Sequence, residues 1–267
     1  MPITCPITFR CLDQQEFGRL SYAVMPHIFA SQNELGNLAD ESVYQADIIA
    51  RLQSAEFTME REVPVTSRFD TFSKTYYLDL VINAEAIFEL KTVARLLPEH
   101  DGQLRNYLLL LDLHHGELVN LRPASVESRF VNSTTKRSQR QHFMVESKSW
   151  TGDAAIMQWI VEMLRDWGTG LELALYHQAI VHHLGGDAAT IQELPMNRAG
   201  IALGNQRFYM MDDHASFRLT AFEEPSPAYR QQLLQLITHS PVSAVHWINI
   251  AYEKVTFTTV QRCTIGG

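Results

Sequence analysis

Two carboxylates and one ammonium group stand close together in the first half of the sequence, at Asp79, Glu89 and Lys91. Residues 74–82 and 86–93 are rich in aromatic and branched side chains, which predicts two strands joined by a tight turn. Because side chains alternate along a strand, Glu89 and Lys91 point to one face, and Asp79 can face them across the hairpin. Ionised groups are costly to bury unpaired, so this arrangement favours a divalent cation, which prefers oxygen ligands.

A simpler interpretation of this cluster is a solvent-facing salt bridge between Lys91 and one of the two acids. Short motifs of this kind match by chance at a high rate. Groups on the neighbouring elements therefore decide between a surface ion pair and a metal site.

The first such group is Glu41, which begins a predicted helix over residues 41–52. Apolar residues recur there at helical spacing, and Tyr44, three residues further on, shares a helix face with Glu41. The Glu41 carboxylate could bind a cation or a cation-bound water. It could also be ordinary surface charge that the helix dipole favours.

A second helix, predicted from Pro98 to about residue 111, carries Gln103 and Tyr107 four residues apart. Side chains at this spacing line one helix face. Both can donate hydrogen bonds to phosphate oxygens, although a tyrosine on a helix surface does not require a ligand.

Helix Glu, strand Asp, strand Glu-x-Lys and helix Gln-x-x-x-Tyr occur in an order that resembles the PD-(D/E)XK nuclease superfamily. More narrowly, residues 18–132 are similar to the bacterial GxxExxY protein family. The residues that carry the likeness are Leu35-Gly36, Glu41-Ser42-Val43-Tyr44, Leu78-Asp79-Leu80, Phe88-Glu89-Leu90-Lys91, Gln103-Leu104-Arg105-Asn106-Tyr107-Leu108 and Leu118-Val119-Asn120. The sequence departs from the family at Leu38, where the glycine that names it would stand.

The resemblance implies a mixed four-stranded sheet flanked by helices, with Mg²⁺ or Mn²⁺ at one sheet edge and hydrolysis of phosphodiester bonds in nucleic acid, DNA in the first place. The implied metal ligands are Asp79, Glu89, the backbone carbonyl of Leu90, and Glu41. The implied catalytic residues are Glu41, Asp79, Glu89 and Lys91, with Lys91 orienting water or stabilising negative charge. The implied substrate-positioning residues are Gln103, Tyr107 and Tyr44.

The second half of the sequence repeats the pattern of the first. Tyr44 matches Tyr176 in similar helical surroundings, and the run 87–93 matches the run 216–222 at nearly the same offset along the chain. At the offset of these two runs, Gln103 also falls on Gln232 and Asn120 on Asn249. The pattern predicts an α/β chain of tandem nuclease-like domains, each with a mixed four-stranded sheet flanked by helices.

The second copy lacks the chemistry-bearing residues of the first. The positions of Glu41, Asp79, Glu89 and Lys91 hold Leu173, Phe208, Arg218 and Thr220, and Tyr107 becomes Leu236. Gly170 stands where the first copy has Leu38. Asp212 and Asp213 could be substitute acids, but their polar surroundings are typical of a turn. We therefore expect a degenerate copy that keeps the fold.

The expected domains are a nuclease-like domain over 1–132, a linker over 133–152 and a degenerate repeat over 153–267. The linker is expected because its first residues are polar and basic. In the first domain, further strands are expected at 57–63 and 117–121, and a helix at 17–31 that Pro26 should kink or break.

Composition limits the remaining possibilities. No run approaches the ~20 apolar residues that span a bilayer, and the N-terminus lacks the pattern of a signal peptide. We therefore expect a cytoplasmic protein without membrane contact. The three cysteines form no zinc or disulfide pattern.

Two interpretations stay open. The net charge of −8 argues against a general nucleic-acid coating protein, although a local basic strip can coexist with it. The first interpretation is a metal-dependent nuclease, acting as a homodimer or with its second copy as an intramolecular pseudo-dimer partner. The alternative is a non-catalytic binding or regulatory module with a nuclease fold.

Overall fold

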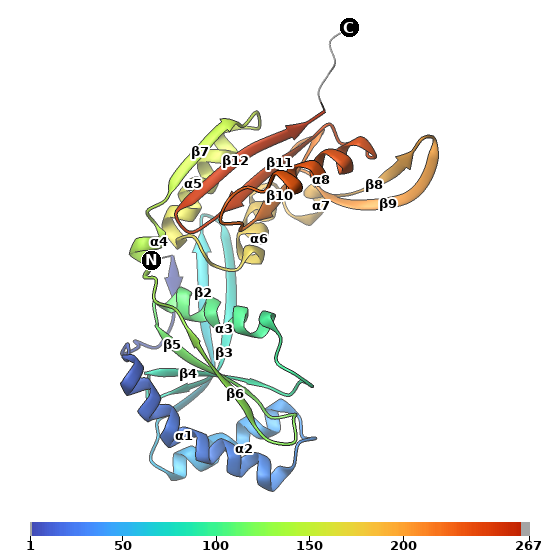
Figure 1. Ribbon diagram of the computed structural model, residues 1–267. Helices are drawn as coiled ribbons and strands as arrows, with labels where there is room; N and C mark the ends of the chain where they lie inside the picture. Colours follow the sequence, from blue (N-terminus) through green and yellow to red (C-terminus); the bar gives the residue numbers. More distant parts are fainter. Residues whose placement is uncertain (1, 263–267) are drawn as a thin grey trace. The chain divides into compact units, whose positions relative to one another are not determined.

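A computed structural model of the chain describes residues 2–262, which form two compact units of mixed α/β structure. Among the described residues, unit 1 comprises those up to Arg68 and Ser73–Arg137, and unit 2 comprises Phe69–Phe72 and those from Ser138 onward (Figure 1). Cys263 lies outside the described residues. No helix in the described part of the chain is long and apolar enough to cross a membrane.

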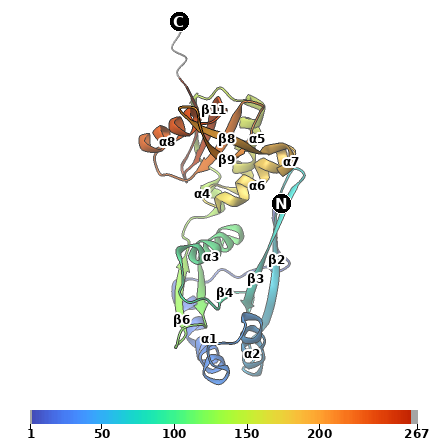
Figure 2. The ribbon, with the colours of Figure 1, turned by 90° about the vertical axis from the view of Figure 1, so that its right-hand side faces the viewer.

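Unit 1 is built on one six-stranded sheet in chain order, with β4 and β5 parallel and the β1–β2, β3–β4 and β5–β6 pairs antiparallel. Its strands are β1 (Ile3–Thr4), β2 (Met59–Phe69), β3 (Phe72–Ile82), β4 (Ala86–Lys91), β5 (His115–Asn120) and β6 (Glu127–Asn132). Its helices are α1 (Gln14–Leu35), α2 (Glu41–Ser54) and α3 (Pro98–Leu111). Helices α1 and α2 cover one face of the sheet and α3 covers the other (Figures 1 and 2).

The prediction of four strands for this domain was wrong, because the sheet has six. The four expected strands correspond to β2, β3, β4 and β5, and the short strands β1 and β6 extend the sheet at its two edges. Strand β2 also runs through Pro64 to Phe69, and α1 runs through Pro26 without a break in the helix. Short edge strands bury few side chains, so they leave little periodic signal in a sequence.

The core of unit 1 between the sheet and helices α1 and α2 is mainly apolar, with a buried hydrogen bond from Ser21 on α1 to Glu117 on β5. Its buried apolar residues come from both helices and from β3, β4 and β5: Leu12, Phe17, Val24, Met25, Ile28, Tyr44, Ile48, Leu52, Leu80, Ile82, Ala86, Phe88, Leu90, Val119 and Leu121. Even-numbered residues of β4 therefore face α1 and α2, and odd-numbered residues, including Glu89 and Lys91, face the opposite side of the sheet.

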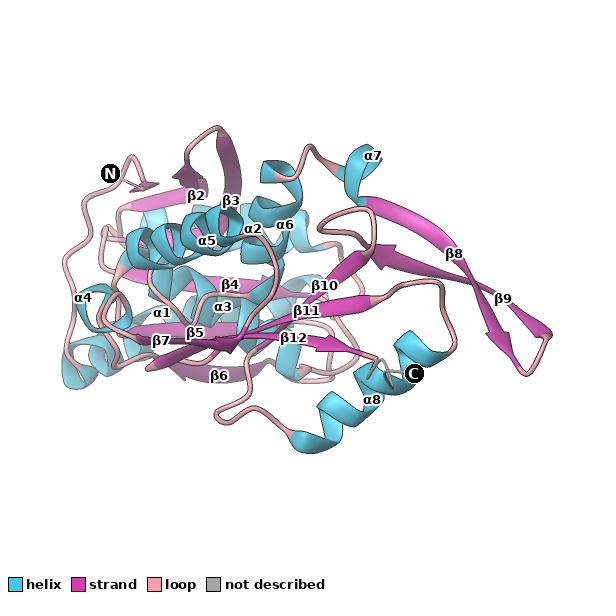
Figure 3. Cartoon of the chain, turned by 90° about the horizontal axis from the view of Figure 1, so that it is seen from above, coloured by secondary structure: helices cyan, strands magenta, loops and turns pink. Residues whose placement is uncertain are grey.

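Unit 2 contains a four-stranded sheet in the order β10-β11-β12-β7 and a separate two-stranded ribbon, β8–β9. Its strands are β7 (Met144–Ser149), β8 (Ile191–Arg198), β9 (Ile201–Tyr209), β10 (Ala215–Thr220), β11 (Ala244–Ile250) and β12 (Lys254–Gln261). The helices that follow α3 along the chain are α4 (Arg137–Arg140), α5 (Ala154–Trp167), α6 (Leu173–His183), α7 (Asp187–Thr190) and α8 (Pro227–Thr238). The ribbon extends beyond the four-stranded sheet of its own unit (Figures 1 and 3).

Residues 133–152, expected to be a linker, contain α4 and β7. Strand β7 pairs in parallel with β12 and forms an edge of the unit 2 sheet. Its alternation of Val145, Glu146, Ser147 and Lys148 buries no side chain fully, so composition alone could not separate this edge strand from a polar connection.

Candidate active site

The register of the β3–β4 hairpin brings Asp79 close to Glu89. Leu80 pairs with Phe88 and Ile82 with Ala86, so Asp79 and Glu89 each lie next to the last paired position of their strand. The connecting turn holds this register through Asn83, whose backbone φ is 54° and whose Oδ1 accepts a hydrogen bond from the Thr58 N–H at 3.0 Å.

Asp79, Glu89 and Lys91 form one contiguous cluster. The Lys91 Nζ lies 2.6 Å from Glu89 Oε1 and 3.9 Å from Asp79 Oδ2. The same Asp79 oxygen accepts a hydrogen bond from the Leu90 N–H at 2.8 Å. The three side chains therefore lie on one face of the sheet, on the side opposite α1 and α2.

Burial makes this cluster electrostatically unusual. The Glu89 side chain is 0% exposed, and Lys91 and Asp79 are 14% and 16% exposed. The second carboxylate oxygen of Glu89, Oε2, is buried and accepts no hydrogen bond from the described residues. A surface salt bridge does not account for this geometry, because a buried polar oxygen without a hydrogen-bond partner is costly whether or not the carboxyl is ionised.

The pKa values of the cluster follow from this burial. Burial, and then the neighbouring Asp79 charge, raise the pKa of Glu89 to about 8 against the opposing effect of Lys91. Burial also raises the pKa of Asp79, although Lys91 and the Leu90 N–H lower it in part. Burial by itself lowers the pKa of Lys91, but the adjacent carboxylates outweigh it and the net shift is upward. The acids thus hold protons more tightly than free carboxylates do.

Glu41 begins α2 and reaches the same neighbourhood. Burial raises its pKa, Lys91 lowers it, and the charges of Asp79 and Glu62 raise it again. A hydrogen bond from the Thr92 backbone also lowers it. Glu41 therefore lies within electrostatic range of the cluster, next to the residue that follows β4.

Glu62 on β2 is the acidic neighbour that the sequence did not reveal. It raises the pKa of both Asp79 and Glu41, and Gln45 donates to its carboxylate at 3.3 Å and to the Asp79 carbonyl at 2.8 Å. Its φ of 49° is a local irregularity within the strand. No spacing rule marks that irregularity, and the alternating charges before Val63 look like a solvated strand edge.

Gln103 and Tyr107 contact each other on α3. The Gln103 Nε2 donates to Tyr107 Oη at 2.9 Å, and the Tyr107 ring packs edge-on against Tyr76 with centroids 5.8 Å apart. The two side chains thus share a face of α3 and are fixed relative to β3.

The expectation that Tyr44 positions substrate was wrong. Its side chain is fully buried in the core of unit 1, and its hydroxyl donates a hydrogen bond to the Gly36 carbonyl. The Tyr44 hydroxyl therefore fixes the connection between α1 and α2 and is not accessible to a ligand.

Asn120, at the end of β5, fixes the chain that leaves β4. Its Nδ2 donates to the Val93 carbonyl at 2.8 Å, and its Oδ1 accepts from the Val93 N–H at 3.1 Å and from the Arg122 N–H at 3.3 Å. The side chain is completely buried. This amide holds the segment directly after Lys91.

A divalent cation fits the chemistry of these donors. The candidate side-chain ligands are carboxylates, which Mg²⁺ and Mn²⁺ prefer, and Glu89 Oε2 is a buried acceptor without a donor in the described chain. Among residues 2–262, no three His, Cys, Asp or Glu side chains are already arranged to hold a metal. The ligand set is therefore present but not preassembled.

The positions of unit 2 that the sequence pattern aligns with this cluster make other contacts. Phe208 is buried with Met210 and Val242, and the Thr220 hydroxyl accepts from Trp247 Nε1 and donates to the Asn249 side chain, both at 2.7 Å. The Asp212 carboxylate accepts the backbone N–H groups of His214 and Ala215. Asp212 is therefore a turn residue, as expected.

Comparison with known families gives one match, which lies within unit 1. Residues 18–131 match the PD-(D/E)XK nuclease superfamily. The match runs from α1 into β6 and includes all four residues of the candidate site, and the mixed α/β structure of unit 1 is consistent with this superfamily. It covers less than half of the chain and does not reach the sheet of unit 2. No curated protein and no solved structure matches the chain.

Proposed function

We propose that unit 1 is a metal-dependent nuclease of the PD-(D/E)XK type that hydrolyses phosphodiester bonds in nucleic acid, DNA in the first place. The observation that carries this proposal is the buried cluster of Asp79, Glu89 and Lys91, with Glu89 Oε2 left without a hydrogen-bond donor. It lies inside the segment that matches the superfamily.

The proposed ligands of Mg²⁺ or Mn²⁺ are Asp79, Glu89 and the backbone carbonyl of Leu90, with Glu41 as a further ligand, directly or through water. When bound, the cation would polarise the phosphate and lower the pKa of a water molecule. The Leu90 N–H holds one Asp79 oxygen in place. Lys91 keeps its proton because three acids surround it, so it can donate to the attacking water or to the developing negative charge. Gln103 and Tyr107 are proposed to position the nucleic-acid backbone.

We further propose that unit 2 is a duplicated copy of unit 1 that has lost this chemistry. Strand registers support the proposal: Lys91 pairs with Asn120 in parallel strands, and Thr220 pairs with Asn249 in the same way, at the offset that joins the runs 87–93 and 216–222. The antiparallel pairs β5–β6 and β11–β12 have the same spacing between the two units. His115 pairs with Asn132 in β5–β6, and Ala244 pairs with Gln261 at the matching positions in β11–β12.

Side-chain hydrogen bonds support the duplication independently. The Asn249 amide donates to and accepts from the Phe222 backbone, both at 2.9 Å, as Asn120 does with Val93. Likewise Tyr176 donates to the Gly168 carbonyl at 2.5 Å, as Tyr44 does to Gly36. Helices α3 and α8 both begin at a proline, and the two prolines again keep the offset of the paired strands.

The test is cleavage of single-stranded DNA, double-stranded DNA and RNA with Mg²⁺ or Mn²⁺, alongside calorimetric titration of either ion. Glu89→Gln and Lys91→Ala are expected to abolish cleavage, and Glu89→Gln to weaken ion binding. Glu117→Gln is the matched control, because Glu117 is a buried acid on the adjacent strand that is bonded instead to Ser21 on α1. Cleavage that survives Glu89→Gln would refute the assignment.

A non-catalytic binding or regulatory role is the second candidate. It is favoured by the 2.6 Å Lys91–Glu89 ion pair, which occupies one oxygen of the central acid, and by the net charge of −8. Calorimetry that detects no divalent ion binding would favour this role over the nuclease.

A further inference from the structure

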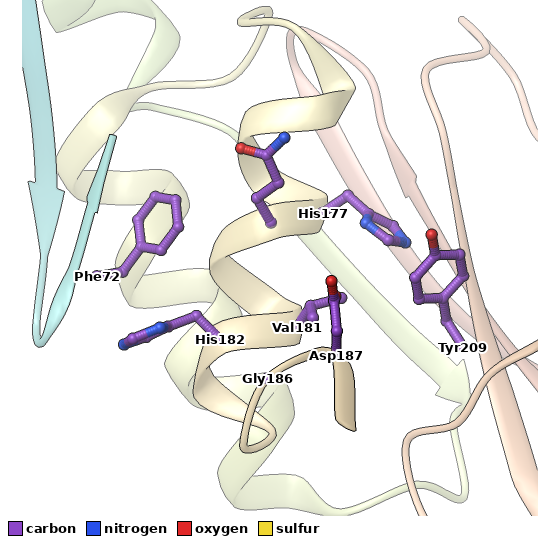
Figure 4. A pocket seen from close by; sticks show the side chains of 8 residues that line it. Phe72, His177, Val181, His182, Gly186, Asp187 and Tyr209 are labelled. Carbon is purple, nitrogen blue, oxygen red and sulfur yellow. The ribbon is translucent and has the colours of Figure 1, made fainter. Parts of the chain in front are cut away.

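The tip of the β2–β3 hairpin belongs to unit 2, where it is seated on α5 and α6. The Phe69 ring packs edge-on against Trp159 with centroids 5.2 Å apart, and the Phe72 ring lies 5.9 Å from Trp167 and 5.6 Å from His182. Figure 4 shows Phe72 and His182 side by side along α6. This seat is mainly aromatic.

The β8–β9 ribbon ends in a two-residue turn, Ala199-Gly200, and the tip around this turn is exposed. When the two units are aligned so that Thr220 matches Lys91, the turn of the ribbon matches the β2–β3 turn. The backbone φ of Ala199 is 49°, and that of Asp70 at the matching position is 51°. Ile201 takes the position of Phe72, yet it is 56% exposed, and Leu203 beside it is 54% exposed.

Unit 1 carries a pocket at the place that corresponds to the seat. A cavity of about 420 Å³ opens between α1 and α2, lined by His27, Asp47, Ala50, Arg51, Ser54 and Ala55. When the two units are aligned so that Tyr176 matches Tyr44, Ala50 corresponds to His182, and His27 corresponds to Trp159. Leu35 corresponds to the fully buried Trp167 and is 39% exposed.

We propose that the β8–β9 tip of a second copy of this chain docks in this pocket, an inference that rests on the duplication proposed above. In the docked pair, Ile201 packs on Leu35 and Ala50 as Phe72 packs on Trp167 and His182. Both the tip and its seat are present on every chain, so a copy of the chain is the partner.

Charge supports the same partner. Asp47 and Arg51 line the pocket, and Arg51 pairs at 2.6 Å both with Asp47 and with Glu34 outside the lining. These two acids share one base, so this group keeps an excess of negative charge. Arg198 takes the position of Phe69 at the tip and is exposed. An arginine facing this group is complementary to it, whereas the aromatic Phe69 faces the aromatic Trp159.

The decisive experiment is directed cross-linking between full-length chains in which Cys5, Cys11 and Cys263 are replaced by serine. One chain carries Ile201→Cys and the other Ala50→Cys, and the two are mixed and oxidised. A disulfide between them is expected only in the mixture, because a disulfide requires Cα atoms within about 7 Å. Tyr22→Cys, on α1 and 83% exposed, is the control that should not cross-link to Cys at position 201.

Mass in solution is the second measurement. Light scattering of the unaltered chain is expected to give a multiple of 30.5 kDa, and Ile201→Asp is expected to return it to the monomer, whereas Tyr22→Asp should not. A monomeric unaltered chain, or equal cross-linking to positions 50 and 22, would overturn the docking proposal. None of these variants alters the nuclease cluster. A chain that forms the oligomer but shows no metal-dependent cleavage would refute the nuclease proposal alone. A monomeric chain that cleaves nucleic acid would refute the docking proposal alone.

Discussion

Removal of the Asn120 amide is expected to destabilise unit 1 and to disturb the end of the catalytic strand. Asn120→Ala deletes three hydrogen bonds, two to Val93 and one from Arg122. At about 1 kcal/mol for each bond, the loss in unfolding free energy is roughly 3 kcal/mol. The small cavity left by the fully buried side chain adds to this loss.

Unit 2 offers a matched control for this variant. The Asn249 side chain makes three hydrogen bonds, with the backbone N–H and carbonyl of Phe222 and with the Thr220 hydroxyl. Asn249→Ala should therefore cost a similar free energy, within about 1 kcal/mol, but it removes nothing near Asp79 and Glu89.

Denaturant unfolding and nucleic-acid cleavage together test this reasoning. Under conditions where both variants remain folded, Asn120→Ala should lower cleavage by at least about tenfold, because small displacements of catalytic groups are costly, and Asn249→Ala should leave it unchanged. Equal loss of cleavage in both variants would refute the proposed division between an active and an inactive copy. A cost below about 1 kcal/mol for Asn120→Ala would refute the role of its amide.

Five further substitutions test individual contacts. Tyr44→Phe and Tyr176→Phe should each lower the unfolding free energy by about 1 kcal/mol in thermal unfolding, and Tyr44→Phe should leave cleavage intact; a large loss of cleavage would return Tyr44 to the site. Gly170→Ala should lower the unfolding free energy by more than about 1 kcal/mol. Gly170 has a φ of 81°, and a Cβ at this position would lie 2.4 Å from Tyr252 Cε1. Leu38→Gly, at the exposed position that matches Gly170, should lower it by less. Burial raises the pKa of Glu117. The stability contribution of this carboxyl is therefore full below the unfolded pKa of about 4.3 and is lost as the pH rises through the folded pKa. Glu117→Gln should be more stable than the unaltered chain near pH 7, and a difference in stability that does not shrink on acidification would refute this.

The hairpin cluster was predictable because three local rules agree on it. Strand alternation places Glu89 and Lys91 on one face, and the tight turn at Asn83 leaves only one register for Asp79. The helix at Glu41 follows from its apolar spacing. Each of these rules acts over fewer than about fifteen residues, within which sequence pattern carries structural information.

What the sequence could not reveal depends on packing between distant segments. Pro26 should have interrupted α1, but the helix buries Val24, Met25 and Ile28 on both sides of it, and such burial outweighs a local cost of about 3 kcal/mol. Glu62 reaches the site through an irregular strand residue. The hydroxyl of Tyr44 turns toward Gly36 for the same kind of reason, since a nearby carbonyl in a buried corner needs a donor.

The contrast between the two units bears on why the charges are present at all. Under the proposed duplication, the same strand register supports Glu89 and Lys91 in one unit and Arg218 and Thr220 in the other. Unit 2 fills the position of Asp79 with a buried Phe208 and gives the Thr220 hydroxyl both a donor and an acceptor. Unit 1 instead keeps a buried acid whose pKa is raised to about 8 and whose second oxygen has no donor in the described chain. The fold therefore does not require these charges, and groups that a fold does not require and that cost it stability are those expected at a functional site.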